Sequence, residues 1–220
     1  MTNNPTKLGR RSTKLAVAAG ALALGAAGVT AAANAAAPTA AAKTHATTFK
    51  MVRSAGAAAA KCIPHAGATV TVRNAGQVEI MNVYAHGLPK NTEFDLFVLQ
   101  VPNAPFGVSW YQGDLETNKY GNGHGRYVGR FSVETFAIAP GVAPAPSVHS
   151  TPIPDATSNP AFGPVHTYHL GLWFNSSADA AKAGCPSTVT PFNGEHNAGI
   201  QALSTRQFQD QHGPLRRINP

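Results

Sequence analysis

Alternating apolar and polar positions dominate the first half of the chain after residue 67. Residues 68–73 (ATVTVR) and 77–85 (QVEIMNVYA) alternate in the way that is typical of half-buried strands, and residues 74–76 separate them as a short turn. Residues 92–101 (TEFDLFVLQV) are apolar at both odd and even positions. Because such a strand has no polar face to turn to water, it is predicted to lie deep in the molecule.

A glycine-rich hairpin is predicted over residues 108–139. Its first arm, SWYQGDLET, meets its second, GRYVGRFSVETFAIA, through residues 118–123. Asn122 and Gly123 in this turn favour the positive backbone angles that tight hairpins require. Residues 140–164 are rich in proline, which cannot donate to a ladder of hydrogen bonds, so they are predicted to form a long connection.

Beyond the connection the strand pattern returns. Residues 166–174 (HTYHLGLWF) alternate again, residues 177–184 fit one or two helical turns, and residues 198–204 fit a closing strand. Short strands with almost no helix predict an all-β fold, an Ig-like antiparallel β-sandwich.

The boundaries of this sandwich follow from shifts in composition. We expect the folded domain to span residues 61–208. Residues 36–60 are largely alanine with few large apolar groups, so they are predicted to be a flexible, disordered lead. Residues 209–220 are polar and are predicted to be a tail.

The first 35 residues have the order of a secretion signal. Lys7, Arg10, Arg11 and Lys14 form a positive start, an apolar Ala- and Leu-rich run follows, and Ala33-Asn34-Ala35 is a small-x-small cleavage site. A retained transmembrane anchor is the alternative, but the run is rich in Ala and Gly and no basic cluster follows it. Paired arginines also leave the twin-arginine route open. The sequence predicts a secreted protein, extracellular or attached to the cell surface, without a membrane span after cleavage.

The net charge changes once the signal is removed. Four of the 17 Lys and Arg residues lie in it and none of the 10 Asp and Glu residues do, so the mature chain is near +3. No stripe of basic residues accompanies Arg126 and Arg130, which argues against nucleic acid as a partner.

The mature chain has two cysteines, Cys62 and Cys185. In an oxidising compartment an even count predicts a disulfide, which would tie the first strand to the last. Two buried free thiols or a metal-binding pair are the alternatives.

Catalytic motifs are absent from the sequence. No Gly-x-Ser-x-Gly elbow is present, and Ser109 lacks the second glycine. Nine histidines are many for this length, yet their spacing forms no metal motif, so no metal or cofactor is predicted. Only the fold can bring a set of them together with Glu195: His86, His124, His166, His169 and His196.

Two carboxylates, Asp114 and Glu116, share one face of a predicted strand, with Glu134 expected across the hairpin. Paired acids serve glycoside hydrolysis or calcium binding. The spacing does not fit an EF-hand loop, which requires glycine and glutamate where this chain has Lys119 and Gly125.

Two segments carry a resemblance, residues 88–131 (GLPKNTEFDLFVLQVPNAPFGVSWYQGDLETNKYGNGHGRYVGRF) and 192–208 (FNGEHNAGIQALSTRQF). They resemble uncharacterised secreted actinobacterial proteins with a predicted β-sandwich domain, which implies no activity. The Gly-Leu-Pro opening is also loosely similar to Cu/Zn superoxide dismutase sandwiches. That family's His-x-His pair would fall at Phe97 and Leu99, which cannot bind copper, so the dismutase activity is rejected.

These observations predict a secreted binding or surface-interaction module of unknown ligand, without catalytic residues. Its partner is expected to be an extracellular protein or a cell-wall component. The alternative is a small exported hydrolase or metal-dependent enzyme that uses Asp114 and Glu116 or a histidine cluster. Because recognition usually lies on loops of a rigid scaffold, we expect contacts at the proline-rich connection and the glycine-rich hairpin. The candidate interaction residues there are Trp110, Tyr111, Asp114, Glu116, Asn122, His124 and Arg126.

Overall fold

The computed structural model describes residues 46–138 and 164–219, which belong to one compact unit. The predicted signal peptide at residues 1–35 lies outside the described residues, and so does the proline-rich connection up to residue 163. No helix in the described parts of the chain is long and apolar enough to cross a membrane.

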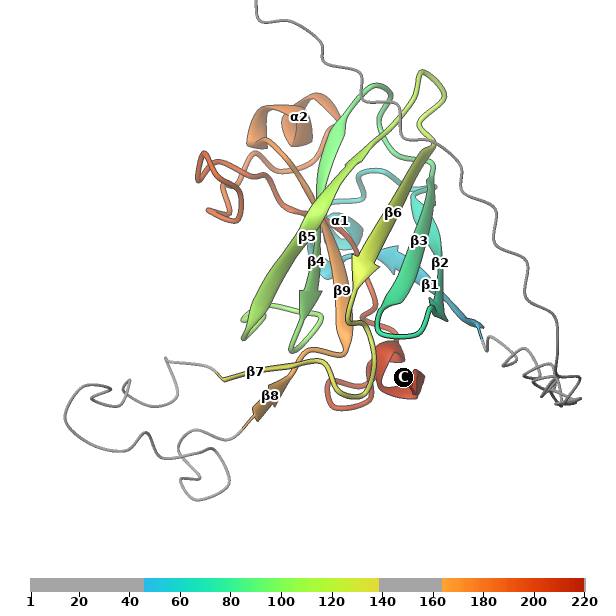
Figure 1. Ribbon diagram of the computed structural model, residues 1–220. Helices are drawn as coiled ribbons and strands as arrows, with labels where there is room; N and C mark the ends of the chain where they lie inside the picture. The colour runs from blue at the N-terminus through green and yellow to red at the C-terminus, as the bar shows by residue number, and fades with distance from the viewer. Residues whose placement is uncertain (1–45, 139–163, 220) are drawn as a thin grey trace, which may run out of the picture. The chain divides into compact units, whose positions relative to one another are not determined.

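Eight strands form one antiparallel sheet in the order β5-β4-β9-β10-β1-β2-β3-β6 (Figure 1). The strands are β1 (Ala46–Arg53), β2 (Gly67–Asn74), β3 (Glu79–His86), β4 (Glu93–Leu99), β5 (Ser109–Glu116), β6 (Gly123–Gly129), β9 (His169–Phe174) and β10 (Gln201–Ser204). A separate pair, β7 (Phe136–Ile138) and β8 (Pro164–His166), flanks the proline-rich connection. The predicted all-β antiparallel sandwich is confirmed.

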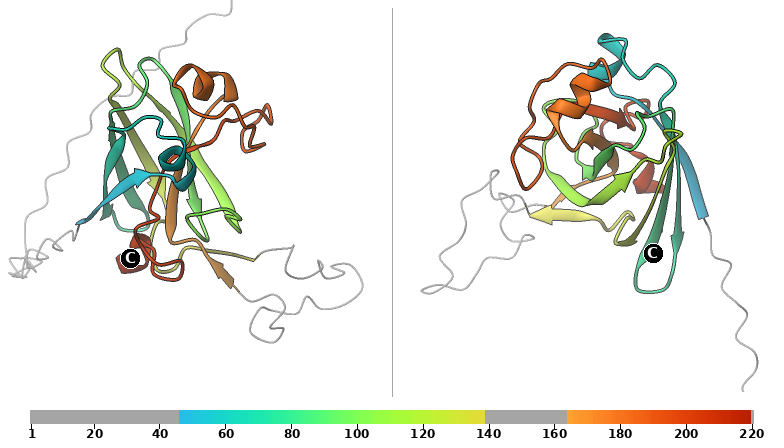
Figure 2. Two further views of the ribbon diagram at one scale, coloured as in Figure 1. Left: turned by 180° about the vertical axis from the view of Figure 1, so that it is seen from behind. Right: turned by 90° about the horizontal axis from the view of Figure 1, so that it is seen from above.

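Strand β1 belongs to both layers of the sandwich. Its residues 46–51 pair with β2, whereas Val52 and Arg53 pair with β10. In the left-hand view of Figure 2, β1 is the blue strand at the front. We call β1-β2-β3-β6 the first sheet and β5-β4-β9-β10 the second sheet. At the other end of the strand order, an isolated bridge between Thr117 and Gly123 links β5 to β6.

The core lies between these sheets. Side chains at alternate positions of β2 and β3, such as Val70 and Val83, point inward and are fully buried. Strand β4 lies between β5 and β9, and every residue from Phe94 to Leu99 is buried. The prediction that this strand is deep is therefore confirmed. On its outer side, a smaller cluster of Phe97, Leu99 and Trp173 is covered by Phe106 and Phe192.

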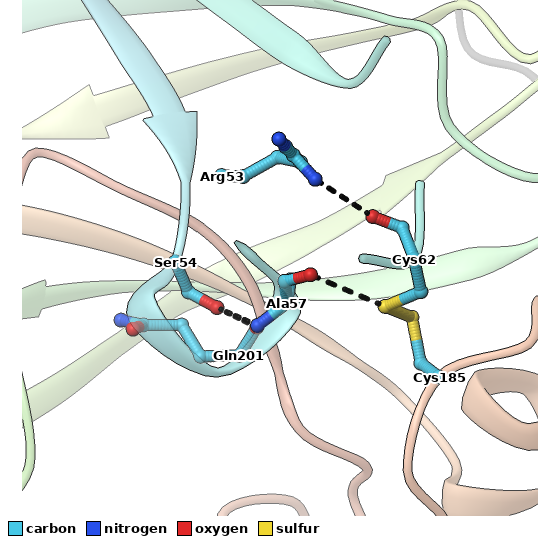
Figure 3. Close-up of a disulfide and its surroundings, with 6 residues drawn as sticks. All are labelled: Arg53, Ser54, Ala57, Cys62, Cys185 and Gln201. Carbon is cyan, nitrogen blue, oxygen red and sulfur yellow. Dashed lines mark hydrogen bonds between the residues drawn. A yellow bond between two sulfur atoms is a disulfide. The ribbon is translucent and has the colours of Figure 1, made fainter. Parts of the chain in front are cut away.

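The disulfide joins Cys62 to Cys185, with the two Cα atoms 5.2 Å apart (Figure 3). Cys62 follows the short helix α1 (Ala55–Ala59) and Cys185 follows α2 (Ser177–Lys182), so the bond ties two helical turns rather than the first strand to the last. Both helices contact strands of the second sheet, α1 at β10 and α2 at β9. Closing a loop of 123 residues stabilises the fold by about 4 to 5 kcal/mol in an entropic treatment.

The flexible lead predicted at residues 36–60 is wrong for residues 46–60, which form β1 and α1. Phe49 and Met51 are buried and alternate with exposed Thr48 and Lys50. This alternation was missed because it is short and the surrounding residues are mostly alanine and threonine. Helix α1 begins where the Ser54 side chain accepts a hydrogen bond from the Ala57 amide, 3.0 Å away.

The polar tail predicted at residues 209–220 is also wrong, because it packs onto the domain. Leu215 lies in a 3-10 helix (Pro214–Arg217), and both Leu215 and Ile218 are buried. The Ile218 carbonyl accepts a hydrogen bond of 2.9 Å from the Val133 amide. Two isolated apolar residues among polar ones are too few to give a periodic signal.

The predicted hairpin has arms that diverge. Strand β5 pairs with β4, and β6 pairs with β3. Strand β6 ends at Gly129, and residues 130–135 form a turn before β7. The Tyr127 hydroxyl spans the opening and donates a 2.9 Å hydrogen bond to the Asp114 carbonyl. The hairpin therefore joins the two sheets instead of lying within one.

Candidate functional site

The outer face of β4 and β5 carries two cross-strand pairs of carboxylates. Glu93 lies opposite Glu116, and Asp95 lies opposite Asp114. Because residues two apart on a strand share a face, all four acids belong to one surface. Like charges directly opposite each other destabilise a sheet, so this surface is held together by the rest of the fold.

A cavity of about 390 Å³ opens over these acids and is called the acidic pocket below. Strands β4 and β5 supply one side, and the segments that follow β9 and α2 supply the other. No Lys, Arg or His lines it. Its lining residues are Glu93, Asp95, Tyr111, Asp114, Asn175, Phe192, Asn193, Gly194 and Glu195.

Asp95 is the most constrained acid of the pocket. Its side chain is almost fully buried, with the residue 2% exposed, and its Oδ2 atom has no hydrogen-bond partner among the described residues. Burial raises the pKa of Asp95 to about 7, and the negative charges of Asp114, Glu93 and Glu195 add to the effect. This carboxyl therefore gains and loses its proton near neutral pH.

Two of the neighbouring acids accept hydrogen bonds from side chains. The Tyr111 hydroxyl donates a 2.5 Å hydrogen bond to Oδ1 of Asp114. The Asn175 side-chain amide donates a 3.1 Å hydrogen bond to Oε2 of Glu93. Burial raises the pKa of Glu93, followed by the charge of Asp114, while the Asn175 bond acts in the opposite direction. Asp95 is thus the acid of the pocket that lacks a donor on one buried oxygen.

A β-bulge in β5 places Tyr111 beside the acids. The register shifts between Leu96, which faces Gly113, and Phe97, which faces Tyr111. In a regular strand Tyr111 and Asp114 would point to opposite faces, because they are three positions apart. The bulge brings both to the outer face, and Gly113 accommodates it with a φ of 140°, which favours glycine.

The segment after α2 is held over the acids by amide hydrogen bonds. The Asn193 side chain donates a 2.7 Å bond to the Asn175 carbonyl and accepts a 2.9 Å bond from the Asn197 amide. The Phe192 ring packs on Phe97 and Trp173, with centroids 5.8 Å and 5.4 Å apart. These contacts place Glu195 on the wall of the pocket together with Phe192.

The residues predicted from sequence divide over several surfaces. Tyr111 and Asp114 line the acidic pocket, and Glu116 adjoins it opposite Glu93. Trp110 is 64% exposed and lines a different groove, of about 510 Å³, with Val128 and Phe136.

The other predicted residues lie away from the pocket. Asn122 is exposed in the β5–β6 turn, and His124 and Arg126 point outward from the first sheet. His124 stacks on Tyr84, with ring centroids 4.4 Å apart. The predicted set is therefore not one contiguous site.

Sequence reasoning missed Glu93, Asp95, Asn175, Phe192 and Asn193. One signal was available, since Asp95 is an acid inside a strand that is otherwise apolar on both faces. Glu134, expected across the hairpin from Asp114, lies instead in the turn between β6 and β7 and does not line the pocket. The acids that neighbour Asp114 come from β4.

The histidines are spread over different elements. His86 is on β3, His166 is on β8 and His196 is in the segment after α2. His169 is buried, where its ring lies 3.0 Å from the Thr205 hydroxyl, and burial lowers its pKa. Among residues 46–138 and 164–219, no three His, Cys, Asp or Glu side chains are grouped so that they could hold a metal ion.

The chain matches no protein-family model, no curated protein and no solved structure. The resemblance to secreted actinobacterial proteins therefore stays a prediction.

Proposed function

We propose that this protein is a secreted binding module and that the acidic pocket is its binding site. The leader pattern at residues 1–35 supports export. The disulfide between Cys62 and Cys185 fits an oxidising compartment. The rigid second sheet presents the pocket on its outer face.

The observation that carries this proposal is the buried Oδ2 atom of Asp95 without a partner. A buried polar atom that makes no hydrogen bond costs about 1 to 3 kcal/mol. Such a cost is typical of functional sites, where a ligand supplies the missing partner. The pocket also combines a few convergent polar groups with aromatic walls, which is usual for small-ligand sites.

Glycoside hydrolysis is a second candidate, favoured by the pair Asp95 and Asp114. Burial raises the pKa of Asp95 to about 7, while Asp114 is exposed and accepts a hydrogen bond from Tyr111. A buried carboxyl with a raised pKa beside a second, exposed carboxyl is a usual arrangement of the two acids of glycosidases. A hydrolase loses turnover in Asp95→Asn while it still binds its substrate, and a binding module shows no turnover at all.

Nuclear magnetic resonance of the mature protein tests the proposal. Amide shifts would be followed during titration with soluble cell-wall fragments, oligosaccharides, short peptides and small amines. We expect at least one of these classes to move the amides of β4, β5 and residues 192–195. The shifts should weaken in Asp114→Asn and persist in Glu134→Gln, a matched change at an exposed acid outside the pocket. Shifts confined to the first sheet would contradict the assignment of the site.

A further inference from the structure

We infer that the acidic pocket binds the primary ammonium group of a small alkylamine ligand. The inference rests on the proposed function and specifies its ligand. The charge of the pocket, its hydrogen-bonding groups and its apolar walls each favour this ligand.

The charge of the pocket is the first step. Glu93, Asp95, Asp114 and Glu195 all line the cavity, and no basic side chain does. The nearest acid along the sheet, Glu116, lies opposite Glu93 and adds to the negative potential. Walls of low dielectric concentrate such a field, so a cation is the ligand charge that the pocket favours.

Hydrogen bonding is the second step. Glu93 and Asp114 each accept a bond from a side chain of the domain, whereas Oδ2 of Asp95 accepts none. An ammonium group has three donors and no acceptor. It can supply the bond that Asp95 lacks and still donate to a neighbouring carboxylate. A neutral hydroxyl has one donor and leaves the negative charges unbalanced.

The apolar wall is the third step. Tyr111 and Phe192 line the same cavity, and both rings pack on Phe97, at 5.6 Å and 5.8 Å between centroids. Aromatic faces attract an ammonium group and also cover the methylene chain that carries it. A volume of about 390 Å³ fits a short alkyl chain.

A divalent metal ion is the competing cation. Calcium requires six to eight oxygen ligands at about 2.3 to 2.6 Å, and magnesium a tighter octahedron. No three acidic, histidine or cysteine side chains in the described ranges are grouped in a way that could hold a metal ion. An ammonium group needs no such closed set of ligands, because it is bound through hydrogen bonds of about 2.8 Å.

The inference gives binding a defined pH dependence. The groups that face Asp95 are Glu93 on its own strand, Asp114 and Tyr111 on β5, and Glu195 from the segment after α2. Burial and these charges raise the pKa of Asp95 to about 7. Since the ionised carboxylate attracts the ammonium group, affinity should rise between pH 6 and pH 8.

Isothermal titration calorimetry of the mature protein tests the inference with 1,5-diaminopentane. We compare it with 1,5-pentanediol, which has the same chain and no charge, and with calcium chloride. The diamine should bind at least tenfold more tightly than the diol at pH 8. Affinity should fall at least tenfold in Asp95→Asn and in Asp114→Asn, and stay unchanged in Glu134→Gln. Using two pocket variants keeps the test valid if one of them fails to fold.

Three results would overturn the inference. The diol would bind as tightly as the diamine, calcium would bind stoichiometrically and displace it, or Glu134→Gln would weaken binding as much as Asp95→Asn. If a neutral oligosaccharide shifts the pocket amides and the diamine does not, the ligand class is wrong but the binding site stands. If a ligand binds only outside the pocket, the proposed function fails as well.

Discussion

Each sheet of the sandwich buries one carboxylate, and the two differ in their hydrogen-bond partners. Glu79 on β3 is fully buried and has partners within the chain. It accepts a 3.2 Å bond from Arg130 and a 2.8 Å bond from the Phe131 amide. Asp95 on β4 is nearly as buried, yet its Oδ2 atom has no partner and acids surround it.

The outer faces of the sheets continue this contrast. On the first sheet, polar side chains pair across strands, as Thr48 does with Thr71 at 3.1 Å and Lys50 with Thr69 at 2.5 Å. Its single acid in the strands is the partnered Glu79. The buried acid of the first sheet is satisfied within the chain and needs no ligand. The unsatisfied acid of the second sheet is therefore the better indicator of a binding site than exposure or aromatic content.

The largest expected effect concerns the disulfide between Cys62 and Cys185. The double variant Cys62→Ala/Cys185→Ala should lower the free energy of unfolding by about 4 kcal/mol, because the unfolded chain regains the entropy of an open loop. Urea denaturation followed by circular dichroism measures this change. A loss below about 1 kcal/mol would show that residual structure in the unfolded state offsets the entropy of the open loop.

Neutralising the partnered acid should destabilise the first sheet. Glu79→Gln removes the charge that Arg130 and the Phe131 amide contact, and hydrogen bonds to a charged group contribute about 2 kcal/mol. Urea denaturation at pH 7 should show this loss, with ligand binding in the acidic pocket unchanged. An unaltered denaturation midpoint would mean that the pair contributes nothing net.

Neutralising Asp95, the unpartnered acid, should stabilise the fold instead of destabilising it. Burial and neighbouring charges raise the pKa of Asp95 to about 7, so the native protein holds a proton that the unfolded chain releases near pH 4. The contribution of Asp95 to the free energy of unfolding is therefore fully present below pH 4 and is lost as the pH rises toward 7. At pH 8, Asp95→Asn should stabilise the fold by on the order of 2 kcal/mol.

Denaturation midpoints at pH 4, 6 and 8 measure this effect. The difference in denaturation midpoint between Asp95→Asn and the natural sequence should widen from pH 4 to pH 8. Parallel curves for Asp95→Asn and the natural sequence would mean that Asp95 titrates normally.

The bulge in β5 predicts a smaller effect. Gly113→Ala places a side chain at a φ of 140° and should cost about 1 to 2 kcal/mol. It should also weaken binding, because Tyr111 depends on the bulge to reach the outer face. Tyr111→Phe, which keeps the ring and loses the hydroxyl, separates the position of the ring from its hydrogen bond to Asp114.

The smallest effect is expected on the outer face of the first sheet. Thr71→Ala removes one exposed cross-strand pair, worth about 0.5 kcal/mol, and His124→Ala removes one stacked ring. Both variants should bind diaminopentane as the natural sequence does, by calorimetry. A tenfold loss in either would move the binding site to the first sheet.

The sequence alone determined most of the strands after residue 67 and the disulfide, but it missed β1. Alternation at residues 68–73 and 77–85 reports which side chains share a face, and that property is local to each strand. Residues 92–101 are apolar on both faces, which predicted a strand deep in the molecule, and two cysteines in a chain predicted to be exported indicated their bond.

Only the tertiary structure decided the site. A strand pattern does not say which strand lies beside it, so the pairing of Asp95 with Asp114 came from the long-range register of β4 and β5. The bulge beside Gly113 places Tyr111 on the same face as Asp114, whereas strict alternation would place the two on opposite faces. Residues 192–195 line the pocket although they lie about a hundred positions along the chain from β4. They are held there because the Phe192 ring packs against Phe97 and Trp173.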